Sequence, residues 1–232
     1  MSVILVTGAL GNIGSRVVRN LVSAEARVRA LVRRPADAKA KLPASVEVVQ
    51  GSYDDAASLR AAMEGAARAL FVTAGPALAR QDAALADAAK AAGVGHIVKI
   101  SVLGAREGSL EIPAWHRAGE QAIEATGLPW TFVRPGSFAS NALNWAPTLR
   151  AAGKAFGAFG AAAIPVIHPD DIADVAALAL TASGHERQIY ELVGPEALTA
   201  AQQVATISEV TGKPFEYVNV PDEAALQGML GA

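Results

Sequence analysis

Three glycines, Gly8, Gly11 and Gly14, constrain the fold of this chain more than any other feature. They follow directly on an apolar run, residues 3–6, and they open a segment of helical periodicity, residues 12–23. In a strand, turn and helix in this order, the first glycine permits the sharp turn and the second lets the backbone approach a ligand. The third lets the helix pack closely on the strand. These residues therefore predict a βα unit that binds a diphosphate at its helix N-terminus.

The alternation of strand and helix continues through the following residues. Short β-branched runs alternate with longer Ala-rich stretches, a pattern that predicts parallel strands joined by crossover helices. The predicted strands are residues 3–7, 28–32, 46–49, 69–73, 96–101 and 130–134, and the predicted helices are residues 12–23, 55–64, 77–92 and 115–125. Right-handed crossovers wind such a series into an α/β fold with a doubly wound parallel Rossmann sheet.

After residue 136 the alternation loosens. Residues 141–163 mix Gly, Ala and Pro with aromatic side chains, and later elements are predicted at residues 166–167, 169–182, 189–193, 199–210, 215–220 and from residue 222 onward. We expect residues 1–136 to form a dinucleotide-binding Rossmann core. Residues 137–232 then complete the sheet and form a small C-terminal α+β cap for the substrate, within a single compact unit.

Composition excludes several classes of protein. The net charge of the 232 residues is −2 and no segment concentrates basic residues, which disfavours a nucleic-acid-binding protein. A hydrophobic fraction of 52% predicts a folded chain with a substantial core. The sequence has no cysteine, which excludes disulfides and a cysteine nucleophile, and no apolar run reaches the roughly 18 residues of a membrane span. We expect a soluble, cytoplasmic protein, and the sequence leaves room for a homodimer.

The residues after the second predicted strand indicate which dinucleotide binds. A carboxylate there would bind the ribose hydroxyls of NAD, whereas an arginine accommodates the 2′-phosphate of NADP. Arg33 and Arg34 occupy this place, and no acidic residue occurs before Asp37. Because guanidinium groups bind phosphate oxygens bidentately, we expect NADPH as the cofactor, with NADH less favoured. The alternative is a solvated basic pair at the end of a strand.

Several segments together resemble the atypical short-chain dehydrogenase/reductases of the NmrA-like branch. They are residues 7–14, 73–75, 98–101, 129–136, 170–173 and 192–195, together with Arg33. That branch includes NAD(P)H-dependent quinone oxidoreductases, triphenylmethane reductases and catalytically silent redox sensors. The resemblance implies that the dinucleotide contacts Gly8, Gly11, Asn12, Ile13, Gly14, Arg33, Thr73 and Ser101, with Pro135 and Gly136 beside the nicotinamide. The remaining candidate cofactor-binding residues are Arg34, Ala74 and Gly75.

The sequence departs from these relatives at the adenine site and at the catalytic site. Members of the group commonly carry an Asp after the third strand to bind the adenine amino group, and Ser52 stands in that neighbourhood here. Orthodox members of the superfamily carry a Tyr-x-x-x-Lys arrangement in which the phenol gives a proton. No tyrosine of this sequence has Lys four residues later.

The equivalent place on the helix after Ser101 holds His116 and Glu120. Their i, i+4 spacing puts both side chains on one helix face. Because a neighbouring carboxylate raises the pKa of an imidazole, we expect this pair to be the candidate proton donor near neutral pH. The alternative is a polar pair on the rim of the helix.

The remaining polar residues are expected to stabilise the fold rather than to take part in catalysis or metal binding. Residues 168–171, His-Pro-Asp-Asp, predict a helix start rather than a metal site, with Asp171 paired to Arg134, and no metal is expected. Lys99 lies inside the fifth predicted strand, which favours an edge or structural role over catalysis.

These features predict an NADPH-dependent reductase that transfers hydride to a small electrophilic acceptor such as a quinone. Hydride transfer of this kind needs mainly the right distance and angle to the nicotinamide C4, so a strong general acid is dispensable. The aromatic residues that could line an apolar acceptor pocket, and could equally be core, are Trp115, Phe138 and Trp145. The runner-up is a non-catalytic NADP(H)-binding redox sensor that acts through a protein partner. A scaffold with a vacant glycine turn is a third reading.

Overall fold

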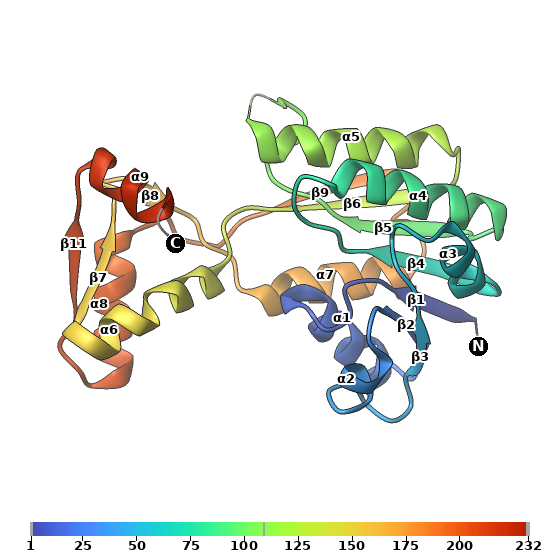
Figure 1. The fold of residues 1–232 in the computed structure, drawn as a ribbon, viewed down its shortest axis with the longest axis horizontal. Coiled ribbons are helices and arrows are strands. Elements are labelled where there is room, and N and C mark those ends of the chain that lie inside the picture. Colours follow the sequence, from blue (N-terminus) through green and yellow to red (C-terminus); the bar gives the residue numbers. More distant parts are fainter. Residues whose placement is uncertain (1, 109, 231–232) are drawn as a thin grey trace. The chain divides into compact units, whose positions relative to one another are not determined.

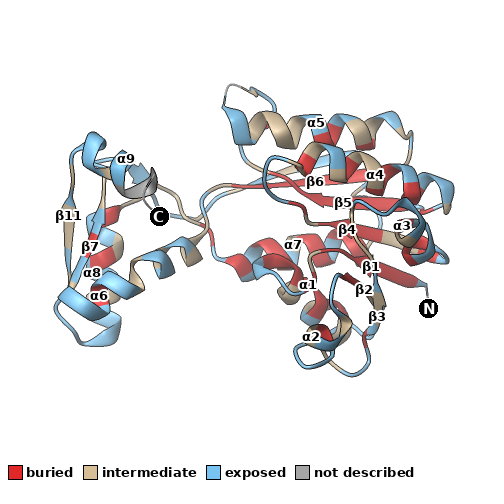
Figure 2. Ribbon diagram, in the orientation of Figure 1, coloured by how far each residue is buried: buried red, intermediate tan, exposed pale blue. Residues whose placement is uncertain are grey.

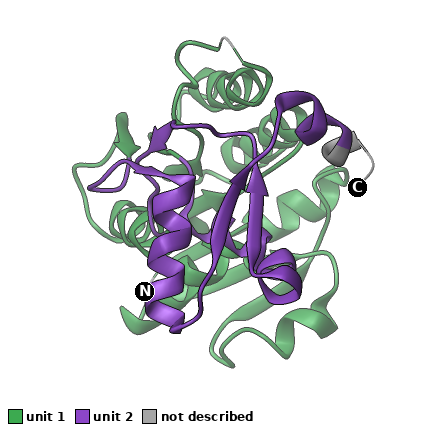
Figure 3. Cartoon of the chain, turned by 90° about the vertical axis from the view of Figure 1, so that its left-hand side faces the viewer, with its two compact units in different colours: residues 1–136, 169–192 green, residues 137–168, 193–232 purple. Residues whose placement is uncertain are grey.

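The computed structural model describes residues 2–108 and 110–230, and its contacts divide the chain into two compact units. Unit 1 comprises residues 1–136 and 169–192, and unit 2 comprises residues 137–168 and 193–232 (Figure 3). The chain leaves unit 1 after Gly136, returns for residues 169–192, and leaves it again. Of the segment 137–232, residues 169–192 belong to unit 1. The expected dinucleotide-binding core and substrate cap within a single compact unit stay predictions.

Unit 1 is built on a seven-stranded sheet with the strand order β3-β2-β1-β4-β5-β6-β9. In chain order these strands are β1 (Val3–Val6), β2 (Arg27–Val32), β3 (Glu47–Gln50), β4 (Ala66–Phe71), β5 (His96–Ile100), β6 (Trp130–Pro135) and β9 (Gln188–Leu192). Every neighbouring pair is parallel. The strand order reverses between β1 and β4, and in such sheets a ligand binds at the carboxyl ends of the strands near this point. The predicted doubly wound parallel sheet is confirmed.

Helices cover both faces of this sheet. They are α1 (Asn12–Ser23), α2 (Pro35–Lys39), α3 (Ala56–Met63), α4 (Leu78–Ala91), α5 (Glu111–Ala125) and α7 (Pro169–Thr181). On one face α1 packs against α7, and on the other α4 packs against both α3 and α5 (Figure 1). Helix α2 was not predicted from the sequence, because a helix of five residues is too short for periodicity to reveal.

The strands are apolar on both sides because both faces of the sheet are covered. All residues of β1, β5 and β6 are buried (Figure 2). Phe71, Leu85 and Phe132 are among the largest fully buried side chains, and the rings of Trp130 and Phe132 stack with centroids 4.1 Å apart. Polar residues are buried in the same unit, and they are Thr7, Thr73, Asp82, His96, Lys99, Ser101, Glu120, Thr131 and Arg134. Burial on this scale requires that such groups find partners.

Unit 2 contains short helices and two small two-stranded sheets. Its elements are the 3-10 helix η1 (Ala139–Trp145), α6 (Ala146–Ala152), β7 (Lys154–Gly157), β8 (Ala163–Ile164), β10 (Leu198–Thr199), α8 (Ala200–Thr211), β11 (Glu216–Asn219) and α9 (Asp222–Leu230). β7 pairs with β11 in parallel, and β8 pairs with β10 antiparallel. A capping box from Thr199 begins α8, and Gly212 ends it in the left-handed conformation. Ile167, expected in a short element, forms an isolated bridge with Phe138 instead.

A helix that crosses a membrane must be both long and apolar. Of the helices in residues 2–108 and 110–230, none combines the length and the apolar character that a bilayer crossing requires.

Candidate functional site

The turn after β1 leaves the N-terminus of α1 open to a ligand. Gly8 has a φ of +61°, in the left-handed region, and its carbonyl accepts the N–H of Gly11 at 2.9 Å. A β-carbon on Gly14 would clash with the same carbonyl, and one on Gly11 would lie 3.2 Å from it. The cap residue Gly11 contributes no side-chain hydrogen bond, and the first turn of α1 carries no acid. Because Gly11 provides no capping side chain and the first turn of α1 contains no acidic residue, the helix dipole and N–H groups here are suited to bind an anion.

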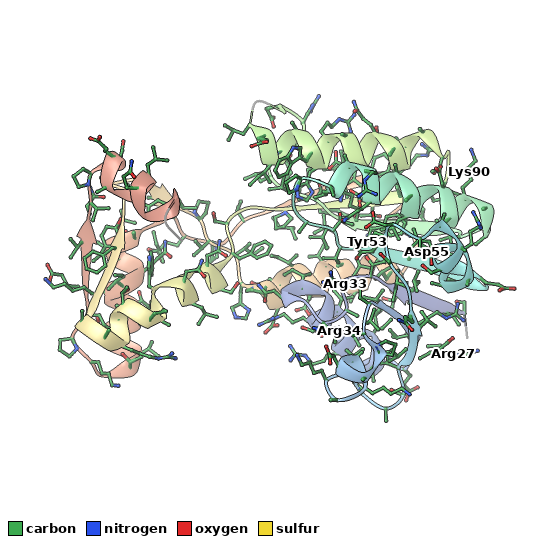
Figure 4. All side chains as sticks on the ribbon, viewed as in Figure 1. Arg27, Arg33, Arg34, Tyr53, Asp55 and Lys90 are labelled. Atoms are coloured by element: carbon green, nitrogen blue, oxygen red, sulfur yellow. The ribbon has the colours of Figure 1, made fainter. Side chains whose placement is uncertain are left out.

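A pocket of about 470 Å³ lies where β2 and β3 end, and it is lined by Arg33 but not by Arg34. Its lining residues are Arg33, Gln50, Gly51, Ser52, Asp55 and Ser58. Arg33 is exposed, and Figure 4 labels it near the end of β2. Within the described part of the chain, the ion pairs of neighbouring arginines are those of Arg29 and Arg34, and none involves Arg33. The Nε of Arg34 instead lies 2.8 Å from Asp37 Oδ2, outside this lining.

These two features meet the requirements of a dinucleotide phosphate. The glycine turn offers a bare helix N-terminus to the diphosphate, and Arg33 offers an unpaired guanidinium at the pocket. Asp55 contributes to the same pocket but is already used to cap α3, where its Oδ1 accepts the N–H groups of Ala57 and Ser58. The described residues therefore fit NADP(H).

A buried cluster centred on Glu120 lies at the ends of β5 and β6. The Nε and Nη2 of Arg134, on β6, bind the two carboxylate oxygens of Glu120 at 2.9 and 2.8 Å. The hydroxyl of Ser101, just past β5, donates to Glu120 Oε1 at 2.6 Å. Burial alone would raise the pKa of Glu120, but the hydrogen bonds from Arg134 and Ser101 lower it below its usual range. Glu120 is therefore an ionised carboxylate with its oxygens occupied.

A second buried cluster joins β4, β5 and α4. Lys99 Nζ lies 2.6 Å from Asp82 Oδ2 and 3.3 Å from Thr73 Oγ1, and both members of the ion pair are fully buried. The Thr73 hydroxyl donates to Asp82 Oδ1 at 2.8 Å. Gly119 on α5 leaves room for this carboxylate, because a β-carbon there would clash with Asp82 Oδ2. Burial raises the pKa of Asp82 and lowers that of Lys99, while their mutual attraction opposes both shifts.

The expected pKa of His116 is wrong. The pKa of His116 is lowered to about 4, because burial and, to a lesser degree, the positive charge of Lys99 lower it and the charge of Glu120 only partly opposes them. Glu120 does raise the pKa of His116 as expected, but burial and Lys99 lower it by more, and the sequence spacing reveals neither of them. The buried Nδ1 of His116 has no hydrogen-bond partner within the described residues. At neutral pH His116 is therefore a neutral imidazole.

The expected partner of Arg134 is also wrong. Arg134 binds Glu120 and lies 3.5 Å from Glu191 on β9, rather than pairing with Asp171. The predicted helix start at residues 168–171 is correct, since α7 begins at Pro169. The neighbouring Asp170 lies 2.6 Å from Arg16 Nε on α1. Among residues 2–108 and 110–230, the acidic and histidine side chains form no group of three that could hold a metal ion.

The other candidate site residues are distributed between the two units. Ala74 and Gly75 follow β4 and are exposed, and Gly136 follows β6, where its N–H donates to the carbonyl of Leu192. The three candidate pocket aromatics do not belong to one unit. Trp115 lies on α5 in unit 1, whereas Phe138 and Trp145 lie in unit 2. Trp145 packs on the small core of unit 2, with its ring centroid 6.2 Å from that of Tyr217.

Asp82 was not expected as a site residue from the sequence, and Lys99 was expected without a partner. A lysine within an apolar strand is itself a signal, since a buried ammonium requires a carboxylate. Lys99 lies on β5, which is flanked by β4 and β6, so an edge position is wrong. Its buried ion pair with Asp82 is consistent with the structural role. Asp82 stands among buried Leu and Ala residues of α4, the pattern that a search for such a partner would have tested.

Comparison with known proteins identifies the family. The sequence matches the NmrA-like family over residues 1–230. The chain belongs to this family. It is 42% identical to a (4-alkanoyl-5-oxo-2,5-dihydrofuran-3-yl)methyl phosphate reductase of Streptomyces griseus, over 98% of this chain and 80% of that protein. It is 39% identical to an NAD(P)H azoreductase of Xenophilus azovorans, again over 98% of this chain and 80% of that protein.

Solved structures of the family have the same fold. The NADPH-dependent quinone oxidoreductase of Escherichia coli, solved in complex with NADPH, matches with a TM-score of 0.88 and 32% identity, over 99% of this chain and 83% of that one. The resemblance to the NmrA-like branch of the short-chain dehydrogenase/reductases is thereby confirmed.

Proposed function

We propose that this chain is an NADPH-dependent reductase that transfers hydride to a small electrophilic acceptor, with a quinone as the expected class. The proposal rests on one observation, that unit 1 holds both an uncapped helix N-terminus after β1 and, in the pocket after β2, an Arg33 that has no ion-pair partner among the described residues. The first suits a diphosphate and the second the 2′-phosphate that distinguishes NADPH from NADH. Relatives that reduce a furanone phosphate, an azo compound and a quinone support the same conclusion.

In this reaction the chain binds the cofactor and orients it toward the acceptor. When bound, NADPH supplies a hydride from its nicotinamide ring. We assign the phosphate contacts to the first turn of α1 and to Arg33. We assign the nicotinamide end to the carboxyl ends of β4, β5 and β6, with Thr73, Ser101, Pro135 and Gly136. The full set of proposed cofactor contacts is Gly8, Gly11, Asn12, Ile13, Gly14, Arg33, Thr73, Ala74, Gly75, Ser101, Pro135 and Gly136, with Arg34 in a lesser role.

The buried groups around Ser101 favour acceptors that need no strong acid. His116 is neutral, Glu120 is an ionised carboxylate held by Arg134, and Lys99 is bound to Asp82. The proton that accompanies hydride transfer then comes from water. Reduction of a quinone suits this arrangement, because its ring stabilises the negative charge that hydride addition leaves on oxygen. Correct placement of the acceptor supplies most of the rate.

The experiment that tests this proposal measures NADPH consumption with a panel of quinones, azo dyes and triphenylmethane dyes. The wild-type protein should consume NADPH with at least one class, and NADH should be a poorer donor. Arg33→Asp serves as the matched control, because it should lose the preference for NADPH without changing the acceptor range. Inertness of the wild-type protein across the whole panel would contradict the proposal.

A redox sensor is the second candidate, and the pairing of Glu120 with Arg134 and of Asp82 with Lys99 favours it, because neither acid is available as a proton donor. Such a protein would bind NADP(H) without consuming it and pass the state of the cofactor to a protein partner. Stable binding of NADPH with no oxidation by any acceptor, together with a complex that forms only with one redox state, would support this second candidate. The cytoplasmic location and the homodimer expected from the sequence stay predictions.

A further inference from the structure

The structure determines whether the hydroxyl of Ser101 donates or accepts in its hydrogen bond with Glu120. A serine hydroxyl carries one proton and two lone pairs. The Oγ of Ser101 lies 2.6 Å from Glu120 Oε1, both side chains are buried, and the contact has the length of a charge-assisted hydrogen bond. Either Ser101 donates its proton to a carboxylate, or Glu120 is protonated and donates to Ser101.

The partners of Glu120 decide between these two directions. Arg134 donates to both of its oxygens, and Arg117 Nη1 donates to Oε2 at 3.2 Å. Arginine stays protonated in proteins and has no acceptor, so an acidic proton on either oxygen of Glu120 would face a guanidinium N–H. Glu120 is therefore a carboxylate, and its hydrogen bond to Ser101 uses the only proton that Ser101 has.

We propose that Glu120 fixes Ser101 as a hydrogen-bond acceptor toward the ligand, so that this end of the sheet selects an N–H or O–H donor of the nicotinamide nucleotide. Glu120 is thus a positioning residue that acts through Ser101. The inference rests on the proposed function, because it takes NADP(H) as the ligand. It also means that Ser101 gives no hydrogen bond to the oxygen of a substrate carbonyl.

The hydroxyl of Thr73, which follows the neighbouring strand β4, also donates its proton to a buried acidic side chain. Phe71 of β4 lies opposite Lys99 of β5, and two residues farther along the two strands lead to Thr73 and Ser101. The Thr73 hydroxyl donates to Asp82 Oδ1 at 2.8 Å and accepts from Lys99 Nζ at 3.3 Å. Its remaining lone pair can only accept. Two adjacent strands therefore end in hydroxyl groups whose protons are both held by buried carboxylates.

Two groups of the cofactor have the required chemistry. The carboxamide of the nicotinamide has N–H donors, and the adjoining ribose has O–H donors. An NADP⁺ analogue in which the carboxamide is replaced by an acetyl group keeps the carbonyl and the ribose but loses the N–H donors. Comparison of NADP⁺ with this analogue therefore distinguishes the two sources.

The test is a double-mutant cycle on NADP⁺ binding, measured by calorimetry with the full chain. Ser101→Ala removes the hydroxyl that is proposed to accept from the ligand. Glu120→Gln reverses the hydrogen bond between residue 120 and Ser101. In Glu120→Gln the amide nitrogen faces a guanidinium N–H in either orientation, because Arg134 donates to both oxygen positions. The position of Oε2 faces a second guanidinium, that of Arg117, so the nitrogen takes the position of Oε1. There it donates to Ser101, whose own proton turns toward the ligand. The matched control is Glu124→Gln, which changes another carboxylate of α5 that binds Arg117 and has no contact with Ser101.

We expect Ser101→Ala to weaken NADP⁺ binding about threefold to tenfold, the range for one lost hydrogen bond. Glu120→Gln should weaken it at least as much, and it should have no further effect in the Ser101→Ala background, because Glu120 acts through Ser101. Glu124→Gln should leave binding unchanged. If the effect of Ser101→Ala disappears with the acetyl analogue, the donor is the carboxamide, and if it persists, the donor is the ribose.

The outcomes separate this inference from the proposed function. Wild-type affinity in Ser101→Ala would overturn the inference while leaving the reductase proposal intact. An undiminished effect of Glu120→Gln in the double variant would do the same, since it would show a structural role that does not pass through Ser101. Failure of the wild-type protein to bind NADP⁺ would overturn both. Ser101→Ala by itself keeps the inference testable should Glu120→Gln fail to fold.

Discussion

At the scale of single residues, neighbours with the same chemistry differ in what they contact. Arg33 and Arg34 are adjacent in the sequence, yet only Arg33 lines the pocket after β2, and Arg34 is bound by Asp37. Glu120 and Glu124 both contact Arg117, yet only Glu120 is fully buried and bound to Ser101. The role of each residue follows from the partner that it has in the fold.

Substitution of Arg33 tests the cofactor assignment. Arg33→Asp should weaken NADPH binding by more than about tenfold and NADH binding only slightly, because it replaces attraction to the 2′-phosphate by repulsion. Arg34→Asp is the matched control and should have a smaller effect, since Arg34 is 82% exposed and already paired. The dissociation constants of both nucleotides are measured. Equal losses of affinity for NADPH and NADH would show that Arg33 does not bind the 2′-phosphate.

The lowered pKa of His116 predicts a pH dependence of stability. Between the ordinary pKa of 6.5 and the value of about 4 in the fold, the unfolded chain binds a proton at this residue and the folded chain does not. His116 therefore makes the protein progressively less stable as the pH falls through this window. His116→Gln should reduce the loss of unfolding free energy between pH 7 and pH 4 by on the order of 2 kcal/mol.

Urea titrations at the two pH values measure this difference. The pH profile of turnover should also show no step near pH 6.5 that His116→Gln removes. Such a step would mean that His116 takes up a proton near neutral pH during catalysis.

At the scale of elements, the contact between α4 and α5 is shaped by a buried charge. Asp82 on α4 reaches Lys99 on β5, and Gly119 on α5 lies where a larger residue would overlap that carboxylate. A glycine in the middle of a helix lowers its stability by about 1 kcal/mol. Here the absence of a side chain is required by the ion pair.

Gly119→Ala should therefore destabilise the protein despite the better helix propensity of alanine. We expect a loss of about 2–4 kcal/mol in the free energy of unfolding, because the β-carbon displaces the Asp82 carboxylate from Lys99 in a fully buried site. Ala118→Ser, on the exposed side of the same helix, should stay within about 0.5 kcal/mol of the wild type. Denaturant unfolding measures both, and a stabilised Gly119→Ala variant would contradict the proposed packing.

At the scale of the whole molecule, unit 1 holds the glycine turn, Arg33 and the two buried polar clusters. Each cluster pairs a base with an acid, Lys99 with Asp82 and Arg134 with Glu120, so neither leaves a buried charge without its counterion. Such pairs cost several kcal/mol if one partner is lost. These two pairs join α4 and α5 to the carboxyl ends of β5 and β6, where the cofactor is proposed to bind.

Ligand binding should accordingly stabilise unit 1. NADP⁺ at about a hundred times its dissociation constant should add about 2.7 kcal/mol of stability, which raises the melting temperature by about 5–10 °C. If the two units melt separately in calorimetry, only the transition of unit 1 should move. Arg33→Asp should reduce the shift, and a shift confined to the transition of unit 2 would place the binding site elsewhere.

The sequence by itself determined the alternating strands and helices of unit 1, the glycine turn and the position of Arg33. These features are local, because hydrophobic periodicity and turn chemistry depend on neighbours along the chain, and α1 accordingly has the predicted bounds. Short elements such as α2 and η1 gave too little periodicity to be seen.

Only the tertiary structure decided the protonation and pairing of the polar residues. Arg134 binds Glu120 rather than Asp171, Lys99 finds Asp82, and His116 is neutral because it lies buried beside Lys99. These outcomes depend on the packing of α4 and α5 over the ends of β4, β5 and β6. Burial and distance set the energy of a charge, and neither can be read from spacing along a chain.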